Sequence, residues 1–160
     1  MYSSFLAEQI RLAHDGPAWH GGALVENLDG IDAERAASRP LPAAHSVWEI
    51  VLHMTGWTNE VARRLEGGAP ELPLEGDWPA VGRVSEQTWA RARKALGEAH
   101  TTLAAAVERF PETRWGDPVG GERNAPLGTG VSYAAMLAGR LQHDAYHGGQ
   151  VGLLRKALRL

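Results

Sequence analysis

The chain has no cysteine among its 160 residues. Disulfide bonds, thiolate metal ligands and cysteine nucleophiles are therefore excluded, and any thiol chemistry requires a thiol supplied by a cosubstrate. No apolar run approaches the roughly 18 residues that a membrane-spanning helix needs. The first residues lack a basic segment followed by a long apolar run, so we expect no signal peptide. The default expectation is a cytoplasmic protein.

Clusters of positive charge are also lacking. The net charge is −3, and the densest basic segment, Arg155–Arg159, lies at the end of a predicted helix, where it complements the helix dipole. The sequence thus predicts neither a nucleic-acid partner nor an anionic membrane partner. Hydrophobic residues make up 44% of the chain and charged residues 22%, which is typical of a globular protein. The length fits a single domain over residues 1–160 with a sizeable core.

Hydrophobic periodicity predicts four long helical segments and no strand. The first runs from about Ser4 to Leu28 with a break at Asp15-Gly16-Pro17, because proline disfavours regular helix through the preceding turn. We expect Phe5 on its buried face, and a second helical piece that begins at Pro17 and carries Trp19. The remaining segments are expected over residues 46–65, 81–110 and 132–158.

Two local patterns support this interpretation. Ser46 and Glu49 form a capping box at the start of the second segment. The third segment repeats large residues every seven positions, which is typical of a helix-bundle seam: Trp89, Leu96, Leu103 and Phe110. The fold class predicted is therefore all-α, a four-helix bundle of up-and-down or crossover type. Such bundles often build metal sites from side chains on facing helices.

Three histidines are the candidate metal ligands. His143 and His147 are four residues apart in the last helical segment, a spacing that places their Cβ atoms on one face, roughly 5–6 Å apart. His53 lies at the edge of the apolar face of the second segment. Taken alone, an HxxxH pair fits a polar helix surface as well as a metal site. Together, three neutral imidazoles without a fourth protein ligand are the composition of a catalytic site with an open position.

Neighbouring residues on the last segment are candidates for supporting this site. The Gln150 amide, one turn after His147, is placed to orient an imidazole or a bound water, and Tyr146 is a second candidate of this kind, although plain packing explains it equally well. Asp144 is expected to pair with Arg140 at i−4 rather than with a metal. No carboxylate stands out as a general base, so a metal-bound water would carry that role, and the catalytic group is expected to be either this water or a metal-bound thiol.

The remaining titratable groups are expected to have ordinary structural roles. Glu60 is expected on a solvated face of the second segment. The other histidines are not expected to bind metal: His14, His20, His45 and His100.

The segments 46–54 (SVWEIVLHM) and 142–150 (QHDAYHGGQ), with 153–158 after them, resemble the DinB/YfiT-like superfamily over essentially the whole chain. The resemblance implies a four-helix bundle that holds a divalent metal, usually nickel or zinc, on one histidine of the second helix and two of the fourth. These map onto His53, His143 and His147. It also implies a homodimer, which is common in this group.

Characterised members of that superfamily include thiol-dependent S-transferases and isomerases that use small thiols such as bacillithiol or mycothiol. The leading hypothesis is accordingly a metal-dependent S-transferase that acts on a small electrophile, with tryptophans shaping an apolar pocket. The alternative is a non-catalytic metal-binding stress-response protein, and a third hypothesis keeps the bundle without a metal. The sequence leaves the native metal, the thiol and the electrophile open.

Overall fold

The protein is described here by a computed structural model that covers residues 2–160. Over this range the chain folds into six α-helices and one 3₁₀ turn, without a β-strand. The all-α prediction is therefore confirmed. The elements are α1 (Tyr2–Asp15), α2 (Leu24–Leu28), α3 (Ala33–Ala37), α4 (Val47–Leu65), α5 (Glu86–Arg109), η1 (Glu112–Arg114) and α6 (Tyr133–Ala157).

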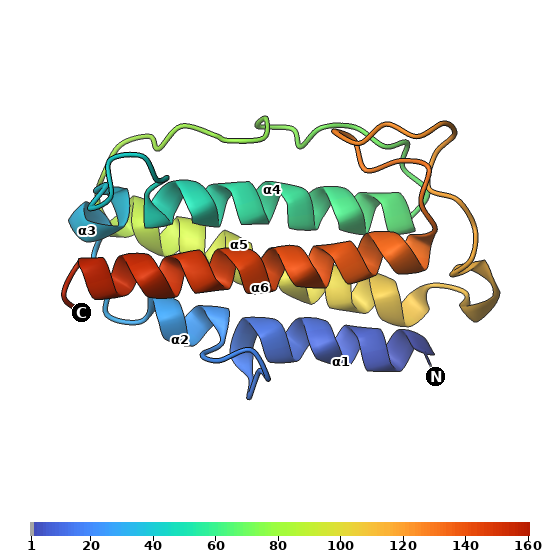
Figure 1. Cartoon of the computed structure of the whole chain (residues 1–160), viewed down its shortest axis with the longest axis horizontal. Coiled ribbons are helices and arrows are strands. Elements are labelled where there is room, and N and C mark those ends of the chain that lie inside the picture. The colour runs from blue at the N-terminus through green and yellow to red at the C-terminus, as the bar shows by residue number, and fades with distance from the viewer. Residues whose placement is uncertain (1) are drawn as a thin grey trace.

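The four long helices α1, α4, α5 and α6 lie side by side along the molecule (Figure 1). Helix α5 packs against α1 and α4, and α6 packs against the same two helices. Helices α4 and α5 run in the same direction, so residues 66–85 return along the whole length of α4 before α5 begins (Figure 1). Of the two bundle types predicted, the structure has the one with a long crossover connection.

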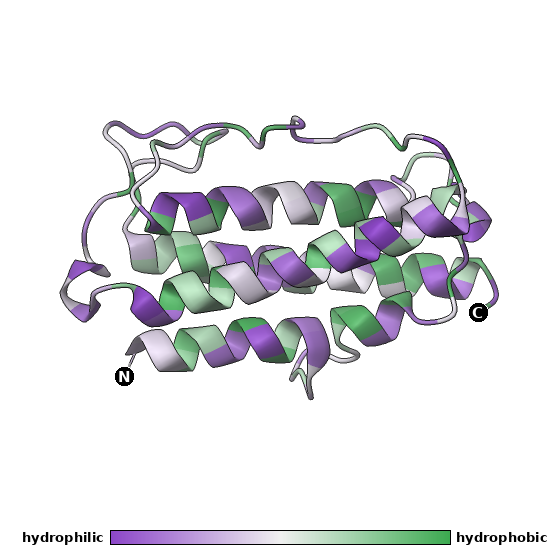
Figure 2. Cartoon of the chain, turned by 180° about the vertical axis from the view of Figure 1, so that it is seen from behind, coloured by the Kyte–Doolittle hydropathy of each residue, from purple (hydrophilic) through white to green (hydrophobic). Residues whose placement is uncertain are grey.

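The core lies between the four long helices, in two clusters of buried residues. The first is centred on Leu103 and Leu137, and the second on Trp48 and Trp89. Hydrophilic and hydrophobic residues alternate around each long helix, as expected for helices with one face toward a core (Figure 2). The predicted seam of α5 is confirmed, because all four of its large residues are buried: Trp89, Leu96, Leu103 and Phe110.

Side-chain caps set where the central helices begin. Ser46 and Glu49 form the predicted capping box at the start of α4. Helix α5 begins at Glu86, five residues after the predicted position 81, because Ser85 and Thr88 form a second capping box there. None of the helices in residues 2–160 combines the length and the apolar character needed to span a membrane.

The first segment departs from the prediction. Phe5 is 58% exposed, and the buried face of α1 consists of Leu6 and Ile10, which the periodicity placed there, together with Ser3 and Ala7. Helix does not resume at Pro17 but only at Leu24, and Trp19 lies fully exposed in the intervening turn. The short helix α3, capped by the side chain of Asp32, was not predicted.

Candidate metal centre

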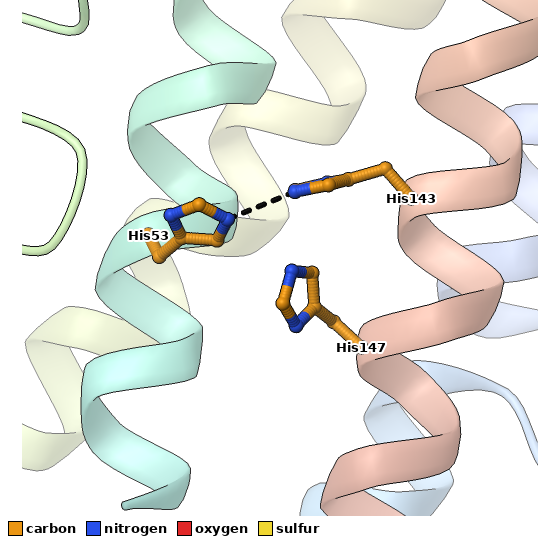
Figure 3. A group of neighbouring side chains, drawn as sticks. All are labelled: His53, His143 and His147. Carbon is orange, nitrogen blue, oxygen red and sulfur yellow. Dashed lines mark hydrogen bonds between the residues drawn. The ribbon is translucent and has the colours of Figure 1, made fainter. Parts of the chain in front are cut away.

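The three candidate histidines meet between two helices. His53 lies in the middle of α4, and His143 and His147 project toward it from one face of α6 (Figure 3). The Nε2 atoms of His53 and His143 are 2.8 Å apart. One ring nitrogen from each residue can be chosen so that all three lie within 4.8 Å of one another. The structure thus brings together the residues that the sequence singled out.

All three imidazoles are held in the neutral form. Burial and, after it, the nearby positive charge of Arg140 lower the pKa of His143 to about 3. Burial also lowers the pKa of His147, to about 4, and that of His53. Because a ligating imidazole must be unprotonated at the binding nitrogen, this environment suits a metal site near neutral pH.

Two of the imidazoles are oriented with an unprotonated Nε2. The Nδ1 atom of His53 lies 2.6 Å from the carbonyl oxygen of Asp77, and the Nδ1 atom of His147 lies 2.6 Å from Oε1 of Gln150. Both oxygens are acceptors, so each Nδ1 carries the proton and each Nε2 keeps its lone pair. This is the usual arrangement of histidine ligands, whose other nitrogen donates to an oxygen outside the metal's own ligands. Gln150 therefore occupies the supporting position predicted for it.

His143 is oriented differently. Its Nδ1 atom lies 2.8 Å from Nη1 of Arg140, which can only donate. Nδ1 is therefore the acceptor, and the proton is on Nε2, where it donates to His53 (Figure 3). For His143 to bind a metal through Nε2, the proton must move to Nδ1 and the contact with Arg140 must open. The donor set fits a three-imidazole metal site once this contact is broken.

The crossover segment covers the site, which the sequence did not indicate. The Trp78 ring stacks on the His53 imidazole with centroids 3.9 Å apart, and also on the His45 ring at 3.6 Å. The segment is held there by Trp57, whose indole Nε1 donates to the Asp77 carboxylate over 2.6 Å. Trp78 therefore shields one face of His53 from solvent. The only sequence signal was an Asp-Trp pair within a proline-rich connection.

A line of buried polar groups leads from the site into the bundle. Arg140 contacts Oδ1 of Asp144 at 2.7 Å, which confirms the expected pair, and the same oxygen lies 3.3 Å from Nε2 of His100. The His100 ring stacks on that of His14 at 4.4 Å. Burial opposes ionisation of Asp144, but the positive charge of Arg140 keeps its pKa below the usual value. His14 and His100, expected to have no special role, thus belong to a buried network beside the site.

The exposure of Tyr146 and of Glu60 bears on two further expectations. Tyr146 is 64% exposed, so it is not part of the core, and its ring meets the edge of His147 at 5.0 Å. Glu60 is buried rather than solvated, which contradicts the expectation. It accepts hydrogen bonds from Arg64 at 2.8 Å and from the backbone of Glu71 at 2.9 Å, because the crossover segment covers this face of α4.

Comparison with known proteins identifies the family. The model of the DinB superfamily matches residues 18–151, a range that includes all three histidines. The chain therefore belongs to the DinB superfamily, as its two histidine motifs predicted. No curated protein and no solved structure gives a significant match. Among residues 2–160, His53, His143 and His147 form the group of histidine or acidic side chains arranged to hold a metal ion.

Proposed function

We propose that the protein is a metal-dependent enzyme that transfers a small thiol to an electrophile, with His53, His143 and His147 as the metal ligands. The observation that carries this proposal is the convergence of three neutral imidazoles within 4.8 Å, with no fourth protein ligand in the group. Structural zinc sites normally have four protein ligands, whereas catalytic sites keep one position open. The absence of cysteine from the chain leaves a sulfur ligand to be supplied from solution.

A bound divalent ion would supply the Lewis acidity that deprotonates a coordinated thiol at neutral pH. The chain contributes orientation and shielding. The Asp77 carbonyl and the Gln150 amide fix two of the imidazole rings, and Trp78 excludes water from one face of His53. In the overall reaction, a bond forms between sulfur and the electrophilic carbon, the leaving group departs with its bonding electrons, and the thiol proton passes to solvent.

Zinc and nickel are both suited to this site, because imidazole is a good ligand for either ion. The test therefore begins with metal-free protein that is reconstituted separately with each metal. Each form is assayed with a panel of small thiols and 1-chloro-2,4-dinitrobenzene as the electrophile, and chloride is the leaving group. We expect thioether formation that depends on the metal and is lost in His147→Ala.

His20→Ala is the matched control, because His20 is exposed and lies outside the three-histidine group. It should keep the wild-type rate. Metal binding without thiol transfer for any thiol or electrophile would favour the alternative, a non-catalytic metal-binding protein. A rate that does not depend on metal would contradict the proposed function.

A further inference from the structure

A cavity of about 260 Å³ adjoins the three-histidine group on the side of His143. It lies between α4, the first half of α6 and the loop that precedes α6. Its lining includes Trp57, Met136 and Val131 together with three arginines. The volume is slightly below the range of about 300–1,000 Å³ typical of pockets for drug-sized ligands. The cavity therefore suits a small molecule with an apolar part.

The charged residues that line the cavity are all positive. Arg64, Arg123 and Arg140 line the cavity, and neither aspartate nor glutamate is among the lining residues. Arg64 is already engaged, because it donates to Glu60 at 2.8 Å and to the carbonyl of Leu127 at 2.7 Å. Its role is to hold the crossover segment and the loop against α4. Arg140 is paired with Asp144 at 2.7 Å, so Arg123 is the arginine left to donate to a ligand.

Arg140 lines the cavity as a buried and paired cation. The side chain is only 4% exposed, and its two terminal nitrogens contact His143 and Asp144. Its Nε atom is buried and has no hydrogen-bond partner within the described chain. Because this atom is shielded from solvent, Arg140 contributes to the cavity through the positive charge of its guanidinium rather than through a free N–H.

Arg123 supplies a charge at the rim of the cavity. It is exposed, and its Nη1 atom donates to the carbonyl of Thr129 at 3.1 Å. No carboxylate lies within ion-pair distance of it among residues 2–160. Gly130, at a φ of +70°, lets the loop close tightly, because a Cβ there would lie 2.7 Å from the Arg123 Cα. The loop thus holds an uncompensated guanidinium beside the apolar walls.

We propose that this cavity binds the carboxylate of a small aromatic or aliphatic acid, with Arg123 as the donor at its rim and Arg140 as a second positive charge in its wall. Arginine is the side chain best matched to a carboxylate, because its planar guanidinium presents parallel donors. Trp57 and Met136 contact the apolar part of the ligand. The assignment of this ligand as a substrate rests on the proposed function, whereas its binding to the cavity does not require a metal.

Benzoate and its uncharged counterpart benzamide are the probes. Each is titrated into metal-free protein, so that a carboxylate has no ion to coordinate, and binding is followed through the NMR amide signals of Gly128 and Gly139. Both glycines line the cavity. We expect benzoate to bind about tenfold more tightly than benzamide, as one charged hydrogen bond would give.

Arg123→Gln should abolish this preference, and Arg123→Lys should keep part of it. Arg83→Gln is the matched control, because Arg83 is exposed, lies outside the cavity and carries the same charge. Equal affinity for the two probes, or an equal loss in Arg83→Gln, would overturn the proposal. A benzoate preference without any thiol transfer would keep this binding site and reject the proposed enzymatic function, so the two failures are distinguishable.

Discussion

Nη1 of Arg140 lies 2.8 Å from Nδ1 of His143, so a permanent cation donates to one of the three candidate metal ligands. Arginine stays protonated throughout the accessible pH range and has no acceptor. The contact therefore stabilises the His143 tautomer whose Nε2 carries the proton and cannot bind a metal. Arg140 also places a positive charge next to the position of a divalent ion. Both effects oppose metal binding.

Removing this arginine should therefore increase metal affinity. A single substitution would leave the buried Asp144 carboxylate without its partner, so the informative comparison is Arg140→Gln/Asp144→Asn against Asp144→Asn alone. We expect the double variant to bind zinc or nickel about tenfold more tightly, the equivalent of one hydrogen bond. Competition with a chelator measures the difference. Equal or weaker binding by the double variant would show that Arg140 does not oppose the metal.

Gln150 should support metal binding through His147. Its Oε1 accepts from Nδ1 of His147 at 2.6 Å, which fixes the ring with Nε2 toward the other histidines. Loss of such a partner typically costs about 10- to 100-fold in metal affinity, so we expect that reduction in Gln150→Leu. Gln142→Leu, at an exposed position of the same helix, is the control and should bind as the wild type does. Unchanged affinity in Gln150→Leu would remove this residue from the site.

The metal-free protein should lose stability as the pH falls from about 7 toward 4. The pKa is lowered to about 3 for His143 and to about 4 for His147, whereas an unfolded histidine titrates near 6.5. Between these values the unfolded chain binds more protons than the folded one, so the free energy of unfolding rises with pH. Urea denaturation at pH 7 and pH 5 measures the slope.

His147→Ala should reduce that slope, and His20→Ala should leave it unchanged, since His20 is exposed. A stability that does not vary between pH 7 and pH 5 would mean that the buried imidazoles do not resist protonation.

The bundle core should tolerate less change than the crossover surface. Leu103 is fully buried on α5, and truncating such a leucine to alanine typically costs about 2–5 kcal/mol in the free energy of unfolding. Leu74 is 99% exposed, so Leu74→Ala should change the free energy of unfolding by less than about 0.5 kcal/mol. Denaturant unfolding of both variants provides the comparison. Similar losses would place Leu74 in a packed environment.

Local patterns in the sequence predicted much of the fold and part of the site. The Ser46 capping box and the seven-residue repeat of α5 depend on interactions within one helix, and the structure confirms both. The convergence of His143 and His147 follows from helical geometry in the same way. His53 was identified as a candidate ligand from its position at the edge of the apolar face of α4.

Contacts between segments distant in the sequence could not be predicted. Trp78 and Asp77 lie in a connection without periodicity, so nothing local indicates that they reach His53. The stacking of His14 on His100 depends on the packing of α1 against α5. Phe5 was misplaced because the buried stripe of α1 begins at the polar Ser3, so that Phe5 lies beside the stripe rather than on it. The single domain, the homodimer and the cytoplasmic location stay predictions.

The central claim is that His53, His143 and His147 together bind one divalent metal ion. The most direct measurement is metal content per chain, determined by elemental analysis after reconstitution and dialysis against a weak chelator. We predict about one ion per chain for the wild type and for His20→Ala, and affinity at least about tenfold lower for alanine variants at each of the three positions. Wild-type metal content and affinity in His147→Ala would contradict the account.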